Sequence, residues 1–141
     1  MKKNLFLLAC LILGASLLLA ACTSASSSVK SRPAAPSTYV NKTNPLAGNA
    51  DAIAKGKMEY TNNCLACHGQ AADGNGPAGA SLSPKPTSLV NALKETSVGY
   101  FFWRTADGGG MDPFKSSMPA FKGVLSEEKI WQIVTYIQTL K

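Results

Sequence analysis

Two cysteines and a histidine stand together in the stretch CLACHG, where two residues separate Cys64 from Cys67 and His68 follows directly. Three chemistries use such a group: a redox-active dithiol, a zinc site, and covalent attachment of a c-type haem. Each chemistry requires different residues elsewhere in the chain, so the rest of the sequence discriminates between them.

The zinc and thiol chemistries lack their other components. A zinc site takes four ligands, or three and a water molecule, and His68 is the only histidine in the chain. A thioredoxin-like dithiol lies between a strand and a helix, but the sequence has no convincing run of alternating β-branched residues. A nucleophilic Cys–His pair is disfavoured because adjacent residues rarely face each other. Haem attachment is therefore the favoured chemistry.

Haem attachment gives each residue of the motif a role. Cys64 and Cys67 would form thioether bonds with the haem, and His68 would be one axial ligand of the iron. A chain with a single histidine cannot supply a second histidine ligand, so a methionine is expected on the other face of the haem.

Two methionines are candidates for that second ligand. Met58 lies shortly before the motif and is expected on the same side of the haem, which leaves Met111 and Met118. Met118 is favoured because Pro119 stiffens its loop and removes a competing backbone donor. Met111 follows the glycines at 108–110, whose conformational freedom is poorly suited to presenting a ligand. The alternative is that Met118 only fills the core.

The first residues form a predicted export signal. Two lysines precede an apolar run over residues 5–19, which is too short for a comfortable membrane span. The junction LAAC at residues 19–22 resembles the lipobox of bacterial lipoproteins, in which a lipidated cysteine follows the cleavage site. We expect residues 1–21 to be a lipoprotein signal peptide and Cys22 to carry the lipid that anchors the protein to a membrane. An ordinary signal peptide and an uncleaved helix are the alternatives.

The composition separates a tether from a folded domain. Residues 22–48 are rich in Ser, Ala, Pro and Thr and are expected to be a flexible tether, whereas residues 49–141 are expected to fold. The formal net charge of +6 fits either solubility or docking to an acidic redox partner protein or an anionic surface. No cluster of Lys and Arg is dense enough for nucleic acid.

Residues 51–141 resemble the class I monohaem c-type cytochromes. The resemblance is carried by GKMEYTNNCLACHG, GNGPAGASLSPKP and MPAFKGVLSEEKIWQIVTYIQTL. It implies an all-α fold in which an N-terminal and a C-terminal helix cross, while short helices and loops wrap one covalently bound haem c. The residues themselves predict helices over 51–62 and 127–140, the second with Ser126 as its N-cap.

The resemblance also implies specific contacts. Gly56 and Tyr60 of the first helix would meet two residues of the last helix, Ile133 and Tyr136. The carbonyl group of Pro77 would accept a hydrogen bond from Nδ1 of the haem-ligating histidine, unless this proline is an ordinary turn residue.

An aromatic run precedes the glycines, and its last residues are candidate haem contacts. Residues 101–103 would form part of the haem wall or of the core. Trp103 and Arg104 would hydrogen-bond the haem propionates, with an exposed Arg104 as the alternative.

The expected function is electron transfer outside the cytoplasm by a lipid-anchored carrier of one electron, because occupied axial positions leave small molecules no easy access to the iron. No small-molecule substrate is expected. The alternatives are a dedicated haem subunit of a larger oxidoreductase and an enzyme with an open sixth position. The sequence leaves open which membrane holds the anchor.

Overall fold

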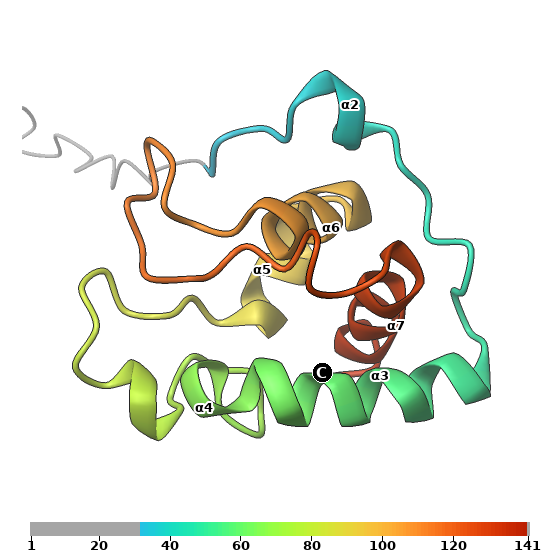
Figure 1. Cartoon of the computed structure of the whole chain (residues 1–141), viewed down its shortest axis with the longest axis horizontal. Helices are drawn as coiled ribbons and strands as arrows, with labels where there is room; N and C mark the ends of the chain where they lie inside the picture. The colour runs from blue at the N-terminus through green and yellow to red at the C-terminus, as the bar shows by residue number, and fades with distance from the viewer. Residues whose placement is uncertain (1–31, 141) are drawn as a thin grey trace, which may run out of the picture. The chain divides into compact units, whose positions relative to one another are not determined.

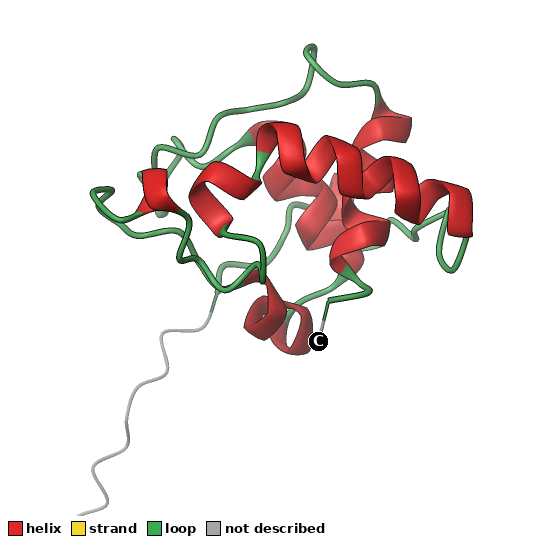
Figure 2. Ribbon diagram, turned by 90° about the horizontal axis from the view of Figure 1, so that it is seen from below, coloured by secondary structure: helices red, strands yellow, loops and turns green. Residues whose placement is uncertain are grey.

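The computed structural model describes residues 32–140. In that part of the chain the elements are α2 (Ser37–Val40), α3 (Ala50–Asn63), α4 (Leu65–His68), the 3₁₀ turn η2 (Pro77–Gly79), α5 (Leu89–Glu95), α6 (Val98–Asp107) and α7 (Glu127–Ile137). These residues form helices and loops with no β-strand, so the predicted all-α fold is confirmed (Figure 2). None of the helices described is long and apolar enough to cross a membrane. The predicted signal peptide and Cys22 lie outside the described residues.

Helices α3 and α7 begin close to the predicted positions because side chains cap them. The side chain of Asn49 accepts a hydrogen bond from the N–H group of Ala52 at 2.9 Å, and the Ser126 hydroxyl accepts one from the N–H group of Lys129 at 3.3 Å. Such caps satisfy backbone donors that have no partner inside the helix. Helix α7 ends at Ile137, three residues before the predicted end, and turns follow it.

The two helices cross at Gly56, and Figure 1 shows α7 lying against the middle of α3. A Cβ atom at Gly56 would overlap the carbonyl oxygen of Gln132, so only glycine permits this approach. The rings of Tyr60 and Tyr136 pack beside the crossing with centroids 5.4 Å apart. The predicted close crossing is therefore confirmed, although the backbone of Gln132, rather than Ile133, faces Gly56. Ile133 lies in the core and is 1% exposed.

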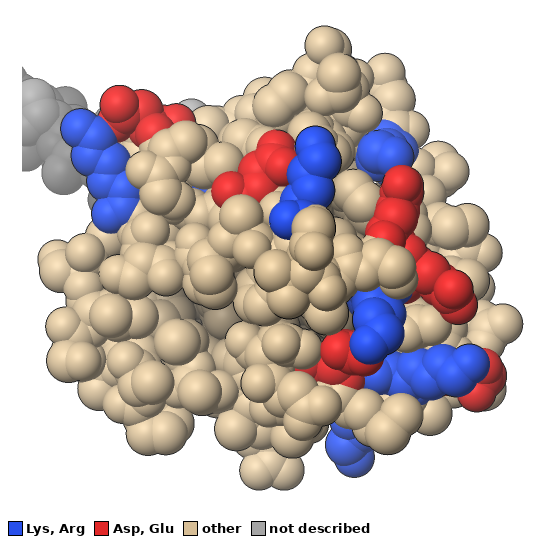
Figure 3. Space-filling model, viewed as in Figure 1, with Lys and Arg blue, Asp and Glu red and all other residues tan. Residues whose placement is uncertain are grey.

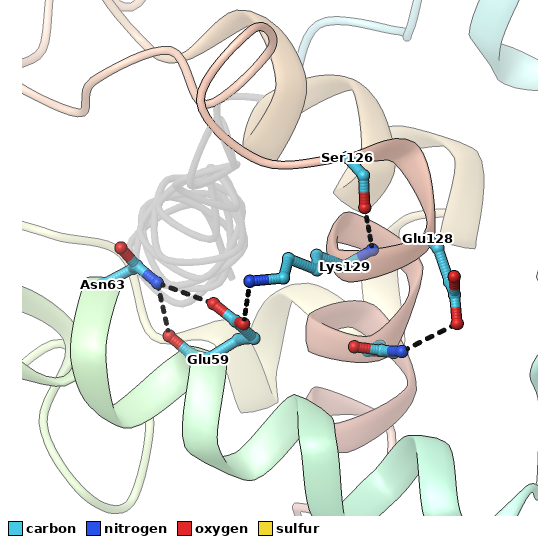
Figure 4. Close-up of polar contacts among 6 residues, drawn as sticks. Glu59, Asn63, Ser126, Glu128 and Lys129 are labelled. Carbon is cyan, nitrogen blue, oxygen red and sulfur yellow. Dashed lines mark hydrogen bonds and ion pairs between the residues drawn. The ribbon is translucent and has the colours of Figure 1, made fainter.

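A polar cluster borders the same crossing (Figure 4). Nζ of Lys129 on α7 lies 2.7 Å from Oε1 of Glu59 on α3, and Asn63 donates a hydrogen bond to the other carboxylate oxygen of Glu59 at 3.2 Å. The Lys129 side chain is half exposed, so this ion pair contributes less than about 1 kcal/mol to stability. The apolar contacts between the helices hold the crossing together.

Aromatic side chains of α6 form much of the core. Phe102 packs against Trp131 of α7 with ring centroids 4.5 Å apart. Trp103 packs against Tyr100 at 5.7 Å and against Phe114, in the segment after α6, also at 5.7 Å. The aromatic run therefore belongs to the core, and it connects α6 both to α7 and to the loop that follows.

The N-terminal segment, residues 32–48, corrects the predicted tether. Its helix α2 packs on α6, where the Tyr39 hydroxyl donates to Oδ1 of Asp107 at 3.2 Å and the Tyr39 ring lies 6.0 Å from that of Phe102. Lys42 pairs with Glu127 of α7 at 3.0 Å. The backbone of Tyr39 fits against Gly99, where a Cβ atom would overlap its carbonyl oxygen. Residues 32–48 therefore pack on α6 and α7 instead of forming a flexible tether, because a few side chains make contacts that composition does not predict.

Candidate haem site

The two motif cysteines lie one helical turn apart at the end of α3 and in α4. Cys64 joins the two helices: its N–H group donates to the carbonyl oxygen of Tyr60 at 2.8 Å, and its own carbonyl oxygen accepts from the N–H group of Cys67 at 3.2 Å. This helical turn brings Cys64 and Cys67 to the same side of the backbone. Neither forms a disulfide. Both thiols are therefore free for covalent attachment.

The Cys64 thiol is unsuited to thiol catalysis. It is 9% exposed, and burial raises its pKa to about 12. A reactive cysteine needs a depressed pKa, because the thiolate is the nucleophile. This observation disfavours both the dithiol and the nucleophilic alternatives.

His68 is oriented through its Nδ1 atom, which lies 3.1 Å from the carbonyl oxygen of Thr87. The predicted acceptor was Pro77, so this prediction is wrong in the structure: Pro77 begins η2, and the chain returning through residues 86–88 brings Thr87 to the imidazole. A proton on Nδ1 leaves the lone pair of Nε2 free for a metal. Burial lowers the pKa of His68, against a smaller opposing effect of the bond to Thr87, and favours the neutral ring that ligation requires.

The glycine-rich loop after the motif packs directly on the motif backbone. The N–H group of Gly76 donates to the carbonyl oxygen of Cys67 at 3.1 Å, and a Cβ atom at Gly76 would overlap the carbonyl group of Ala66. The Tyr60 hydroxyl donates to the carbonyl oxygen of Gly69 at 2.7 Å. The attachment motif is thus enclosed by residues that are its near neighbours in the sequence.

Met118 is held by a different set of contacts, to the end of α6. Its carbonyl oxygen accepts a hydrogen bond from the N–H group of Gly109 at 2.9 Å, and the N–H group of Phe121 donates to the carbonyl oxygen of Thr105 at 3.1 Å. Gly108 has φ +73°, and a Cβ atom there would lie 2.7 Å from the backbone nitrogen of Ala120. Gly108 and Gly109 are buried against the chain segment that contains Met118, so they are required for close packing and are not merely flexible.

Met111, the other candidate ligand, lies beside Arg104. Nη1 of Arg104 is 3.5 Å from the Met111 sulfur and donates a hydrogen bond to the carbonyl oxygen of Gly108 at 2.7 Å. The guanidinium carbon lies 3.6 Å from the centroid of the Phe114 ring. Arg104 and the buried Trp103 thus have protein partners, and their predicted contacts with haem propionates remain predictions.

The residues present fit a covalently attached haem better than a zinc ion. Within residues 32–140, no group of three or more His, Cys, Asp or Glu side chains could hold a metal ion. Two free thiols on one turn and a neutral imidazole with an oriented Nδ1 are what haem c requires. Bound there, the haem supplies an iron that gains and loses one electron. Cys64 and Cys67 would attach it, and Thr87 would orient the ligating imidazole of His68.

Comparisons with known proteins agree with this geometry. Residues 51–137 match the family described as cytochrome c oxidase, cbb3-type, subunit III. Cytochrome c6 of Leptolyngbya boryana is 35% identical over 88 residues, which are 62% of this chain and 91% of the relative. The cbb3-type cytochrome c oxidase subunit CcoP of Azospirillum sp. (strain B510) is 30% identical over 103 residues, which are 72% of this chain but 33% of CcoP.

A solved structure shows the same fold. A chain of the reducing HAO-like protein complex of Kuenenia stuttgartiensis superimposes with a TM-score of 0.57 at 24% identity, over 77% of this chain and 51% of the other. The family match covers the whole attachment motif, and the thiol pair, the histidine and the all-α fold agree with it. This chain therefore belongs to the cbb3-type subunit III family of cytochromes c, and it is a monohaem c-type cytochrome that carries electrons on one covalently bound haem c.

Proposed function

We propose that this cytochrome is a lipid-anchored electron carrier on the extracytoplasmic side of a bacterial membrane, with His68 and Met118 as the axial ligands of its haem iron. One observation carries the ligand assignment: the backbone of Met118 is bonded to Gly109, whereas the sulfur of Met111 lies against Arg104. A ligand must be held in place to offset the entropy of ordering its loop. The backbone of Met111 is held as well, since its carbonyl oxygen accepts hydrogen bonds from Phe114 and Lys115, but the sulfur of Met111 is engaged by Arg104, which favours Met118.

Ligation by histidine and methionine suits a carrier of single electrons. Two occupied axial positions keep small ligands from the iron, and a thioether ligand raises the reduction potential. No side chain other than His68 offers an imidazole as a general acid or base, and ligation occupies that one. We therefore propose electron exchange with partner proteins and no reaction on a small-molecule substrate.

The anchor would keep the haem close to the membrane. Nine residues, 23–31, separate Cys22 from the first described residue, Arg32. Nine residues span at most about 32 Å, so the cytochrome could not lie far from the membrane. The cytochrome would then exchange electrons with proteins in or on the same membrane, where tethering raises their effective concentration.

The surface over α4 supports docking that depends little on charge. Figure 3 shows Lys and Arg beside Asp and Glu over α3 and α7, whereas the part of this face over α4 shows no charged side chain. A partner that approaches the attachment motif there would meet an uncharged surface. We expect the rate of electron exchange to vary weakly with ionic strength, since steering by charge is what salt suppresses.

A second candidate function is a dedicated subunit of a larger oxidoreductase. It is favoured by the match to CcoP, a subunit of a cbb3-type oxidase, of which this chain covers 33%. Mild detergent solubilisation of membranes that contain the native protein, followed by size-exclusion chromatography, separates the two functions. A free carrier elutes alone, and a subunit co-elutes with stoichiometric partner chains.

The ligand assignment is tested by the weak far-red absorption band of methionine-ligated oxidised haem. The wild type should show this band, Met118→Ala should lose it and bind carbon monoxide when reduced, and Met111→Ala should keep it. A wild type that binds carbon monoxide readily at neutral pH has an open sixth position and contradicts the assignment.

The anchor is tested by fractionation. Wild-type protein should remain with membranes after a high-salt wash, and Cys22→Ala should be unprocessed or soluble. Wild-type protein in the soluble fraction with an unmodified Cys22 would exclude a lipid anchor.

A further inference from the structure

Arg104 is half-buried although no carboxylate neutralises it in the described part of the chain. None of the ion pairs among residues 32–140 includes Arg104. Burial removes water from the guanidinium group and lowers its pKa. Desolvating a cation without an ionic partner is unfavourable, so other contacts must hold the side chain in this place.

Apart from the ring of Trp103 on the same helix, 5.8 Å from Cζ, those contacts lie in one segment, the Met118 loop (residues 108–118). Nη1 of Arg104 donates to the carbonyl oxygen of Gly108 at 2.7 Å and lies 3.5 Å from the sulfur of Met111. The guanidinium group lies over the ring of Phe114, with 3.6 Å between Cζ and the ring centroid. Arg104 itself belongs to α6, so a single side chain joins this helix to three points of the loop.

The path from Arg104 to Met118 passes through Gly109. The N–H group of Gly109 donates to the carbonyl oxygen of Met118 at 2.9 Å, and its carbonyl oxygen accepts from the N–H group of Ser116 at 2.8 Å. A Cβ atom at Gly109 would lie 2.9 Å from Nη2 of Arg104 and 3.2 Å from Cβ of Met118. The guanidinium group and the Met118 side chain therefore border the same small space.

We propose that Arg104 is a positioning residue that holds the Met118 loop against α6 and thereby keeps the Met118 thioether at the sixth coordination position. This inference rests on the proposed ligation by Met118. Arginine suits the task because its planar fork can donate to a carbonyl oxygen while it stacks on an aromatic ring. Lysine keeps the charge but not the flat fork.

The test compares Arg104→Met and Arg104→Lys with a matched control, Arg32→Met. Arg32 is the other arginine of the chain and pairs with Glu95 at 2.8 Å at the surface, far along the chain from the Met118 loop, so its replacement removes the same charge. In each holoprotein the far-red band and the far-UV helix signal are followed during heating and during titration to high pH. Carbon monoxide binding to the reduced protein is measured in parallel.

We expect Arg104→Met to lose the far-red band at a lower temperature and a lower pH than the wild type while the helix signal persists. Its affinity for carbon monoxide should rise about tenfold or more, which corresponds to about 1.4 kcal/mol less stabilisation of the methionine-bound state. Arg104→Lys should fall between Arg104→Met and the wild type, and Arg32→Met should match the wild type.

Each outcome separates the two hypotheses. A wild type without the far-red band contradicts the ligation by Met118. If the wild type shows the band, two results for Arg104→Met contradict only the positioning role. The band and the helix signal are both unchanged, or they are lost together. If Arg104→Met does not fold, Arg104→Lys decides: a band as robust as that of the wild type overturns the inference.

Discussion

The two sides of the haem site are built in different ways. On the attachment side, Cys64, Cys67 and His68 occupy one helical turn, and the loop that encloses them follows within twenty residues. On the side where we propose the second ligand, Met118 is held by the end of α6, which in turn packs on α7 through Phe102. Figure 1 shows α4 (green) and the segment after α6 (orange) as separate parts of the molecule. Local geometry forms the first side, and long-range packing forms the second.

The largest effect is expected from removing the attachment chemistry. The double substitution of Cys64 and Cys67 by alanine should abolish covalent haem, because the thioether bonds have no other donors in this part of the chain. Intact-mass measurement after acid–acetone extraction should show one haem on the wild type and none on the variant. A variant that retains covalent haem would contradict the motif's role. Substituting Met118 leaves the thioether bonds in place, so the two sides are separable.

The next effect sharpens the comparison with one glycine on each side. Gly108→Ala places a side chain at φ +73° against the Met118 segment of the loop, whereas Gly76→Ala places a methyl group where it overlaps the backbone of Ala66. Gly108→Ala should cost about 2–4 kcal/mol of unfolding free energy, from backbone strain and overpacking, and Gly76→Ala, at φ −66°, about 1–3 kcal/mol from overpacking alone. Gly108→Ala should also weaken the far-red band, while Gly76→Ala should lower the yield of holoprotein and leave the band of the remainder intact.

Gly110→Ala is the matched control, because a Cβ atom there meets nothing within 4 Å. Denaturant unfolding and the far-red spectrum are measured for the three alanine variants. If Gly110→Ala destabilises the protein as much as Gly108→Ala does, general stiffening of the glycine run, and not close packing, determines the result. If Gly76→Ala loses the band, the two sides are not independent.

The smallest effect is expected in the N-terminal segment. Tyr39 donates to Asp107, the residue that precedes Gly108 and the Met118 loop. Tyr39→Phe removes this partly exposed hydrogen bond and should cost less than about 1 kcal/mol of unfolding free energy. The far-red band should be nearly unchanged, since the bonds between Gly109 and Met118 remain.

The contribution of Tyr39 should also depend on pH. Burial, followed by the charge of Asp107, raises the pKa of Tyr39 above its ordinary value of 10.0. The folded protein thus holds this proton more tightly than the unfolded chain, so the stabilisation is fully present below pH 10 and is lost as the pH rises through the folded-state pKa. The difference between wild type and Tyr39→Phe in denaturant unfolding should be constant from pH 6 to about pH 9. A difference that grows above pH 10 would contradict the assignment.

The errors of sequence-based prediction lie where distant parts of the chain meet. The one-turn spacing of Gly56 and Tyr60 predicted α3, and the cap Ser126 with an apolar stripe predicted α7, because such signals act within a few residues. The acceptor of the His68 hydrogen bond was predicted to be Pro77, and the structure has Thr87. The tether was predicted to extend to residue 48, but Tyr39 and Lys42 anchor its second half on α6 and α7. A composition low in large apolar residues does not reveal a surface on which one tyrosine can pack.

The sequence by itself determined the chemistry of the site, because two thiols and an imidazole within five residues share one helical turn in any helix that forms there. The resemblance of the sequence to a known family also predicted a close helix crossing at Gly56, although not which atom of the partner helix would meet it. Only the tertiary structure decided that Thr87 orients His68 and that Gly108, Gly109 and Arg104 bring the Met118 loop to the end of α6. The sequence around each of these residues does not determine its partner. The contacts form only when the packed helices bring the backbones together.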